Sequence, residues 1–220
     1  LAYRHGLYEG ILKGIDLRGK EVLDAMCGGG ESTAFFLGHG ARVTGTDISP
    51  QQCSIYQGRF PSCPITCSSL LKTQYQDESF DFVVVDSLHH LHPQVSDGVR
   101  EVVRILKPGG HLLIWEPVAG SALDLLRKLW YRLDRKYFES NERSIDVKDL
   151  LGQSGGQLKL IQAQYGGNVG YLLVATSMLF RIPPKLVGFS GPALTGIDRL
   201  LSVVQPRCLS CWVLALMQRV

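Results

Sequence analysis

The chain has 220 residues, with 23 basic and 20 acidic side chains and a formal net charge of +3. Hydrophobic residues make up 45% and charged residues 20%, which is ordinary for a globular protein and excludes a largely disordered or fibrous chain. The small net charge does not indicate strong electrostatic binding of nucleic acid. The chain is long enough to bury a substantial hydrophobic core.

The six cysteines do not form the compact ladder of a small secreted domain, and no secretory leader opens the chain. We therefore expect free thiols and a cytoplasmic location. The sequence starts at Leu1 rather than at a methionine, which is compatible with a trimmed N-terminus. No run of 18 apolar residues occurs, so we expect no transmembrane helix.

Strand-like and helix-like segments alternate along the first half of the chain. Apolar and β-branched runs predict strands at residues 21–24, 42–46, 64–67, 80–85 and 111–115. Helices are predicted at residues 32–37, from Ser49-Pro50 onward and at 95–106, where Lys107-Pro108-Gly109-Gly110 should stop the helix and turn the chain. The alternation of strands and helices predicts βαβ units and a parallel sheet.

The last third reads differently. A basic amphipathic stretch at 121–135 predicts a helix, and residues 158–164 and 212–217 predict strands. Residues 168–203 read as an insertion that ends in a helix near 193–203. We expect a single domain over residues 1–220, with a core at about 15–118, 157–164 and 211–218 and cap elements at about 119–150 and 168–203.

The strongest motif is a strand that runs into Cys27-Gly28-Gly29-Gly30 and then into a helix. Glycines let the backbone approach a ligand closely, and the start of the helix offers unpaired N–H groups. Asp47 follows about 20 residues later at the end of the next strand, where a carboxylate can accept hydrogen bonds from ribose hydroxyls. The structural alternative is that Asp47 only caps the following helix.

These segments resemble, in their order, the class I S-adenosylmethionine-dependent methyltransferases of the small-molecule type. The match comprises the glycine loop, the strand end at Asp47, Asp77-Glu78-Ser79-Phe80-Asp81 and Arg104-Ile105-Leu106-Lys107-Pro108-Gly109-Gly110, within about residues 15–118. The resemblance implies an α/β fold with a Rossmann-like, doubly wound, mostly parallel seven-stranded sheet, helices on both faces and a helical cap. It also implies an enzyme that uses S-adenosyl-L-methionine and releases S-adenosyl-L-homocysteine.

The resemblance implies these cofactor-binding residues: Asp24, Ala25, Cys27, Gly28, Gly30, Asp47, Ile48, Ser69, Leu70 and Ser87. Asp24 would lie near the amino group of the methionine portion, Asp47 would hold the ribose and Ile48 would pack on the adenine. Met26 stands where the family usually has glycine, and Ser69 where it often has aspartate. These departures motivate the alternative of a non-catalytic S-adenosylmethionine-binding module.

Three histidines, His89, His90 and His92, follow the fourth predicted strand, where the methyl acceptor should arrive. Histidine titrates near neutrality and suits a general base, which is needed only if the acceptor must lose a proton. The candidate catalytic residues are His90 and His89, with His90 favoured, and simple packing is the alternative. Asp86-Ser87-Leu88-His89 replaces the Asn-Pro-Pro-aromatic box of amino-group methylation, which disfavours nucleic-acid and protein substrates.

The cap region is rich in aromatic and aliphatic residues, which favours a small apolar acceptor of natural-product, quinone or lipid type and O- or C-methylation. Tyr3 and Tyr8 either close over the cofactor or pack. A basic cluster within 127–136 suggests weak contact with a membrane surface, unless it is a solvated face.

Cys208 and Cys211 have a metal-like spacing without a second such pair, so we expect no metal site. The oligomeric state is left open.

Overall fold

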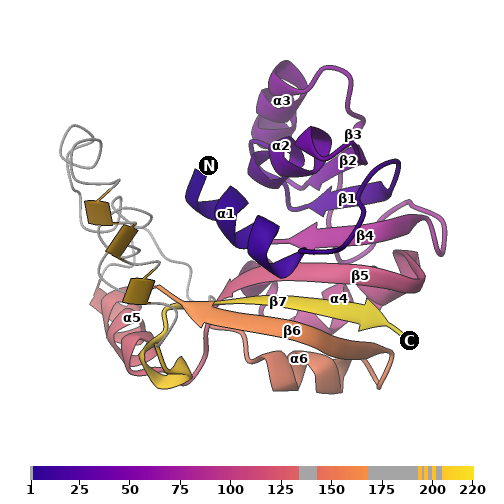
Figure 1. The fold of residues 1–220 in the computed structure, drawn as a ribbon. Coiled ribbons are helices and arrows are strands. Elements are labelled where there is room, and N and C mark those ends of the chain that lie inside the picture. Colours follow the sequence, from indigo (N-terminus) through magenta and orange to yellow (C-terminus); the bar gives the residue numbers. More distant parts are fainter. Residues whose placement is uncertain (1, 134–142, 168–192, 195, 198–199, 202–204) are drawn as a thin grey trace. The chain divides into compact units, whose positions relative to one another are not determined.

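The computed structural model describes residues 2–133, 143–167, 193–194, 196–197, 200–201 and 205–220 (Figure 1). Its strands form one seven-stranded sheet in the order β3-β2-β1-β4-β5-β7-β6. The strands are β1 (Glu21–Ala25), β2 (Arg42–Asp47), β3 (Ile65–Cys67), β4 (Phe80–Val85), β5 (Leu106–Pro117), β6 (Leu158–Gly166) and β7 (Trp212–Arg219). The predicted strands are thus confirmed, each within a few residues of its expected bounds apart from the earlier start of β5.

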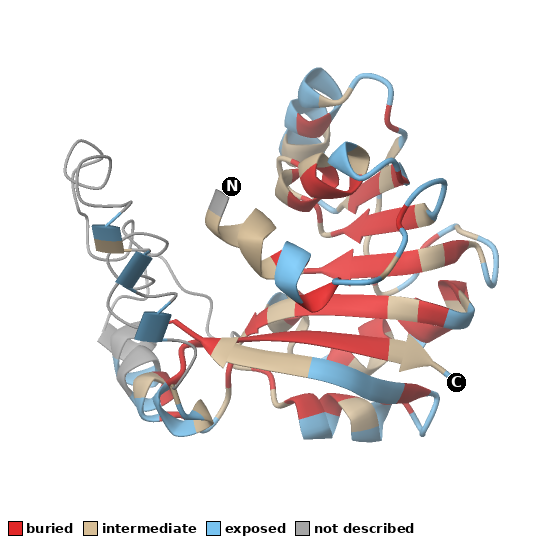
Figure 2. Ribbon diagram, viewed as in Figure 1, coloured by how far each residue is buried: buried red, intermediate tan, exposed pale blue. Residues whose placement is uncertain are grey.

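The neighbouring pairs β1–β2, β1–β4, β2–β3 and β4–β5 are parallel, and Figure 1 shows β7 running in the opposite direction. Buried residues make up most of β1 and β4 and the middle of β5, as expected for strands covered on both faces (Figure 2). The predicted mostly parallel, Rossmann-like sheet is therefore confirmed.

The helices are α1 (Ala2–Ile11), α2 (Glu31–Gly38), α3 (Pro50–Arg59), α4 (Val95–Ile105), α5 (Ala122–Leu133) and α6 (Val147–Gln153), with 3₁₀ turns η1 (Leu88–Leu91) and η3 (Arg207–Leu209). As predicted, Ser49 caps α3, its hydroxyl accepting from the Gln52 amide, and Pro50 opens the helix. Helices α1 and α6 were not predicted. Most of the expected insertion at 168–203 lies outside the described residues.

The predicted turn after α4 is only partly right. The helix ends at Ile105 as expected, but β5 begins at Leu106, which pairs with Phe80. The register then shifts between Phe80 and Phe82, so the residues of the proposed turn form the irregular start of a strand.

The chain forms two compact units, Leu1–Glu116 with Asn141–Ala163 and Leu214–Val220, and Pro117–Ser140 with Gln164–Val213. The candidate site described below lies in the first unit. Within the described residues, no helix combines the length and apolarity needed to cross a bilayer.

Candidate functional site

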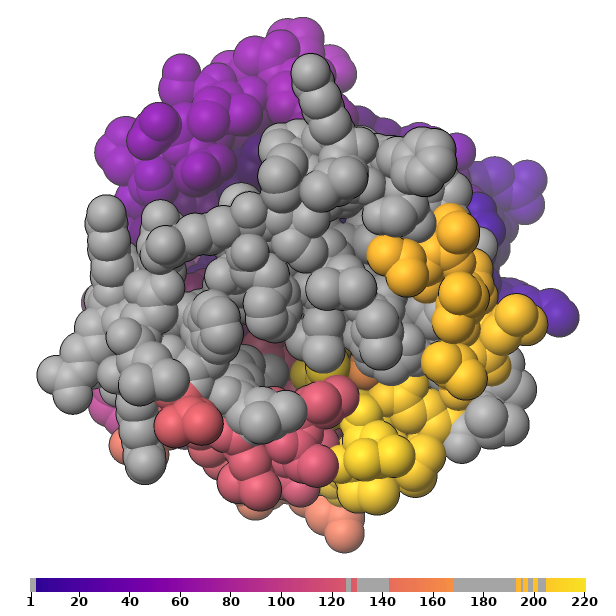
Figure 3. Space-filling view, turned by 90° about the vertical axis from the view of Figure 1, so that its left-hand side faces the viewer, coloured from indigo at the N-terminus to yellow at the C-terminus, as the bar shows by residue number. Residues whose placement is uncertain are grey.

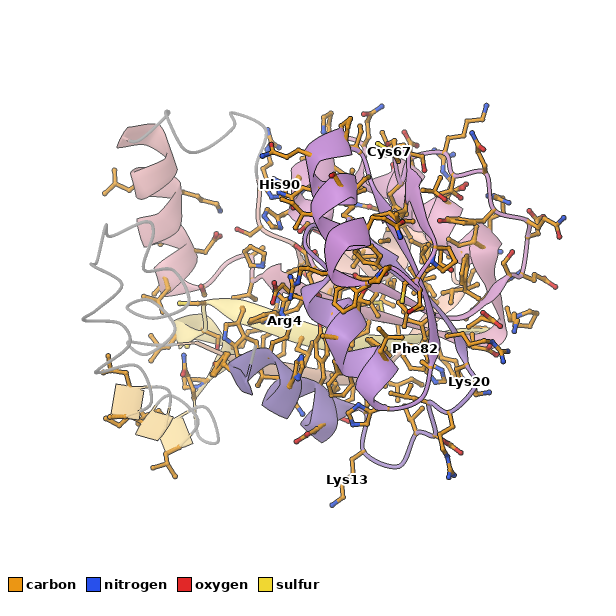
Figure 4. The ribbon with its side chains drawn as sticks, turned by 90° about the horizontal axis from the view of Figure 1, so that it is seen from above. Arg4, Lys13, Lys20, Cys67, Phe82 and His90 are labelled. Atoms are coloured by element: carbon orange, nitrogen blue, oxygen red, sulfur yellow. The ribbon has the colours of Figure 1, made fainter. Side chains whose placement is uncertain are left out.

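The site lies at the carboxyl ends of β1, β2 and β4. Because these strands are parallel neighbours, the segments that follow them meet at one edge of the sheet. From β1 the chain passes to β2 and β3 on one side, and β4 lies on the other side, so this edge is a topological switch point where ligands of open α/β sheets bind. In Figure 4, Arg4 and His90 lie toward this end of the strands and Lys20 toward the opposite end.

The loop after β1 keeps the conformation of a glycine loop although one glycine is missing. Met26 has φ 54°, in the left-handed region that favours glycine, and Gly28 and Gly30 have φ 50° and 79°. The loop is fixed to the neighbouring strand because the Cys27 amide donates to the Thr46 carbonyl at 3.0 Å. The departure at Met26 therefore leaves the shape of the loop intact.

The two flanking glycines meet different surroundings. A Cβ at Gly30 would lie 2.4 Å from Cε2 of Phe60, so this residue must be glycine for packing reasons. A Cβ at Gly28 would meet nothing closer than Oε1 of Gln52 at 3.9 Å. The backbone at Gly28 consequently faces open space in which a ligand can approach it.

Asp47 faces this loop from the end of β2. Its Oδ2 accepts from the Gly28 amide at 2.9 Å, and its Oδ1 accepts from the Ser49 amide at 2.8 Å. The capping residue of α3 is Ser49 rather than Asp47. A carboxylate offers about four acceptor positions, so Asp47 retains capacity for the hydroxyl donors of a ribose.

The other residues predicted to contact the adenine differ in their exposure to solvent. Ile48 is 70% exposed, although isoleucine is usually buried. Leu70 is buried, and the Ser69 hydroxyl accepts from the Leu71 amide at 3.2 Å. Ile48 is therefore available to an apolar ring, whereas the side chain of Leu70 is covered by the protein.

Asp24 and Ala25 are both buried at the end of β1. Oδ2 of Asp24 accepts from the Thr33 amide at 2.8 Å and from the Thr33 hydroxyl at 2.6 Å, which fixes the first turn of α2 against β1. Burial raises the pKa of Asp24 to about 7, more than the hydrogen bonds from Thr33 lower it. A cationic group brought close to this carboxyl would stabilise its ionised form.

Cys27 contributes only its backbone to the loop surface. Its side chain packs in a buried cluster with Tyr56 and Cys63, and burial raises the pKa of its thiol. Sequence reasoning placed Cys27 in the loop correctly, and the structure directs its sulfur into the core.

The sequence analysis missed a buried network around Asp86, the residue that follows β4. Arg4 Nη1 donates to Asp86 Oδ2 at 2.7 Å, Ser32 Oγ donates to the same oxygen at 2.7 Å, and Tyr8 donates to both carboxylate oxygens. The guanidinium of Arg4 also lies 4.9 Å from the ring centroid of Trp115. Tyr8, with no exposed surface, is therefore a packing and hydrogen-bonding residue of the site wall.

The histidines after β4 differ in their surroundings. Nδ1 of His89 lies 2.7 Å from Oε2 of Glu116, whose Oε1 accepts from the Leu88 amide at 2.6 Å. Glu116 is buried at the end of β5, and His89 is largely covered. His90 is exposed, its ring centroid 4.1 Å from that of His89, and its amide donates to the Ser87 carbonyl at 3.1 Å. Of the two candidate histidines, His89 is the one whose ring contacts Glu116; the sequence favoured His90, and the catalytic role of either stays a prediction.

Together these features define a Rossmann-like α/β protein with a nucleotide-binding loop at the ends of its parallel strands. Residues 23–114, less than half of the chain, match the family described as a methyltransferase domain, in agreement with the predicted resemblance to class I methyltransferases. Members of this family use S-adenosylmethionine.

Known proteins resemble this chain in part of its sequence or in its fold. The phthiotriol/phenolphthiotriol dimycocerosates methyltransferase of Mycobacterium leprae is 32% identical over 110 residues, which span 48% of this chain and 41% of the relative. A putative methyltransferase from Bacillus halodurans has a TM-score of 0.68 at 17% identity and covers 97% of both chains. The N-methyltransferase NodS from Bradyrhizobium japonicum, solved with S-adenosyl-L-homocysteine, has a TM-score of 0.60 at 17% identity, over 99% of this chain and 86% of its own.

The residues at the sheet edge fit the cofactor of this family. The open face of Gly28, the remaining acceptor capacity of Asp47 and the exposed side chain of Ile48 match a backbone approach, ribose hydroxyls and an adenine ring, respectively. Among the described residues, no group of three or more His, Cys, Asp or Glu side chains could hold a metal ion.

Proposed function

We propose that this chain is an S-adenosylmethionine-dependent methyltransferase that methylates a hydroxyl group of a small apolar acceptor. The observation that carries the methyltransferase assignment is the hydrogen bond between Asp47 and the Gly28 amide, which joins the ribose-binding carboxylate to the glycine loop. The matched family segment and the topological switch point support the same assignment.

In this proposal the cofactor is held by the loop and by the ends of β1 and β2. Asp47 accepts hydrogen bonds from the ribose, Ile48 covers the adenine, and Asp24 lies on the side of the methionine amino group. When bound, the cofactor supplies a methyl group on a positively charged sulfur. The protein then has to hold the acceptor in line with that methyl group and exclude water, and orientation alone contributes several kcal/mol, about 7 or more in favourable cases.

The pair His89–Glu116 supports a hydroxyl acceptor. A carboxylate only accepts hydrogen bonds, so Nδ1 of His89 carries the proton that lies between it and Glu116. Nε2 is then the basic nitrogen and takes the hydroxyl proton of the acceptor as the new bond forms. The buried Glu116 fixes the orientation of the imidazole and stabilises the imidazolium that results.

Two observations support an apolar acceptor. The mycobacterial relative is named for phthiotriol and phenolphthiotriol dimycocerosates, which are lipids. In the second unit, α5 exposes 67% of Leu125 and 54% of Leu129, with exposed Lys128 between them. Because Lys128 is ion-paired with Asp124 at 2.9 Å, the two exposed leucines are what suits an interfacial helix. Together with the basic cluster within 127–136 they support contact with an anionic lipid surface, which we include in the proposal. Failure to float with anionic vesicles would remove this part of it.

The proposal is tested with purified protein, S-adenosylmethionine and a panel of hydroxyl-bearing apolar acceptors. Mass spectrometry should detect a methylated product and S-adenosylhomocysteine. The variant His89→Gln should lower kcat by about 10² or more, because it removes the proton acceptor, and leave cofactor affinity by calorimetry unchanged. The matched variant His90→Gln should retain activity. Equal losses in the two variants would contradict the assignment of the base to His89.

A non-catalytic binding module is the second candidate, favoured by Ser69 in the place where the family often has aspartate. It requires tight binding of S-adenosylhomocysteine with no product from any acceptor of the panel. Absence of binding to either form of the cofactor would contradict both candidates.

A further inference from the structure

Two cysteines lie against the backbone that carries the proposed adenosine-binding residues. Cys53, in the first turn of α3, donates its thiol to the Asp47 carbonyl at 3.5 Å. Cys67, the last residue of β3, donates its thiol to the Ile48 carbonyl at 3.7 Å. The two sulfurs thus bind successive carbonyls of the segment whose side chains face the cofactor site.

The two thiols are also close enough to each other to interact electrostatically. Strand pairing contributes to this, because Cys67 is the parallel-sheet partner of Asp47. Cys67 is exposed and Cys53 is half-buried, so small reagents in solution can reach the pair. In Figure 3, α3 and the segment after it form the purple surface at the upper left, and Figure 4 labels Cys67.

We propose that Cys53 and Cys67 form a reversible dithiol–disulfide site that controls the affinity of the adjacent cofactor site. The proposal rests on the proposed function for the identity of the bound nucleoside. The oxidant is a hydroperoxide such as hydrogen peroxide, and a low-molecular-weight dithiol reverses the reaction.

The reaction proceeds in two balanced steps. The sulfur of Cys67 attacks the peroxide oxygen, the O–O bond breaks, and water leaves as Cys67 becomes a sulfenic acid. The sulfur of Cys53 then attacks that sulfur, the S–O bond breaks, and a second water leaves with the thiol proton, which gives the disulfide. Exposure favours Cys67 as the first thiol, because burial and the neighbouring Cys67 sulfur raise the pKa of Cys53 to about 11 and lower its thiolate fraction.

The disulfide removes both thiol donors from the Asp47 and Ile48 carbonyls. The backbone that aims Asp47 at the ribose and Ile48 at the adenine then loses two of its restraints. We expect oxidation to weaken binding of S-adenosylhomocysteine by about tenfold, the equivalent of about one ordinary hydrogen bond.

Trypsin provides a direct assay, because it cuts after Arg42, Arg59 and Lys72. After peroxide treatment and thiol blocking, peptide 43–59, with Cys53, should be linked to peptide 60–72, and fragmentation should place the link at Cys67 rather than Cys63. Cys53→Ser and Cys67→Ser should each abolish both the link and the peroxide sensitivity of binding. Cys208→Ser, a change at an exposed cysteine of the other unit, should retain both.

Absence of the linked peptide, or a link to peptide 21–42 with Cys27, overturns the inference. A complete link with unchanged affinity for S-adenosylhomocysteine overturns the control of binding. If the reduced protein binds no S-adenosylhomocysteine, the proposed function fails instead, and the linked peptide alone then decides whether the dithiol site exists.

Discussion

Tyr8 donates its phenolic hydroxyl to both carboxylate oxygens of Asp86, over 2.9 and 2.8 Å. The same hydroxyl lies 3.0 Å from Oγ of Ser32 in α2. One side chain therefore joins α1, the start of α2 and the end of β4. Because Asp86 directly precedes Ser87 and the histidine turn, α1 is part of the wall of the candidate site.

Replacing Tyr8 by phenylalanine keeps the ring, which packs 5.2 Å from Phe35, and removes the donor to a largely buried carboxylate. We expect the free energy of unfolding to fall by about 1–3 kcal/mol, measured by urea denaturation. Tyr165→Phe is the control, because among the described residues the contact of Tyr165 is the guanidinium of Arg207 above its ring. An equal loss in the two variants would show that the hydrogen bonds to Asp86 contribute nothing.

Asp24 predicts an unusual pH dependence of stability. Its pKa of about 7 in the fold exceeds the ordinary value of 3.8, so the folded protein holds this proton more tightly than the unfolded chain. The stability gained from protonation is complete below about pH 4 and lost as the pH rises to about 7. Asp24→Asn should remove this loss, on the order of a few kcal/mol, in denaturation series from pH 4 to 8. Exposed Asp16→Asn is the control, and parallel curves for Asp24→Asn and the parent would contradict the prediction.

Met26 holds a left-handed backbone conformation that costs a non-glycine residue about 1–2 kcal/mol. Met26→Gly relieves this cost but loosens the unfolded chain, so we expect a net change within about 1 kcal/mol and full binding of S-adenosylhomocysteine. Met26→Val should be clearly less stable, because a β-branched residue resists this conformation. Thermal unfolding measures both. A valine variant as stable as the glycine variant would disprove the strain.

Gly30 is restricted by packing as well as by its backbone. A side chain there would meet the Phe60 ring at 2.4 Å, so Gly30→Ala should destabilise the fold by about 1–3 kcal/mol. Gly38→Ala, at the end of α2 with open space around it, should change stability by less than about 0.5 kcal/mol. Chemical denaturation compares the two, and a harmless Gly30→Ala would mean that Phe60 moves aside freely.

Local patterns predicted the elements that carry the site. The run Phe80–Val85 is a strand with the predicted bounds, and Ser49-Pro50 starts a helix, because apolar runs and capping residues act over a few neighbours. The short helix α6 was missed, although Asp146 caps it and Val147 and Leu150 form its buried face. A single apolar pair over two turns is too weak a pattern to separate from a loop.

Long-range partners could not be predicted in the same way. Arg4 and Asp86 are far apart in sequence, and only the packing of α1 brings them together. Glu116 gave a weaker hint, as an acidic residue directly after the predicted strand at 111–115. Glu116 contacts His89 and not His90 because of the direction in which the 3₁₀ turn η1 holds each ring. The spacing of the residues in the sequence does not predict this direction.

Met26 also bears on how such chains are recognised. The related family usually has glycine at the position of Met26, yet Met26 adopts the positive φ that favours glycine. The signature is in truth a sequence of dihedral angles, and glycine is merely the residue that adopts them most readily. A sequence motif that requires glycine at this position will miss homologues in which another residue adopts the same dihedral angles.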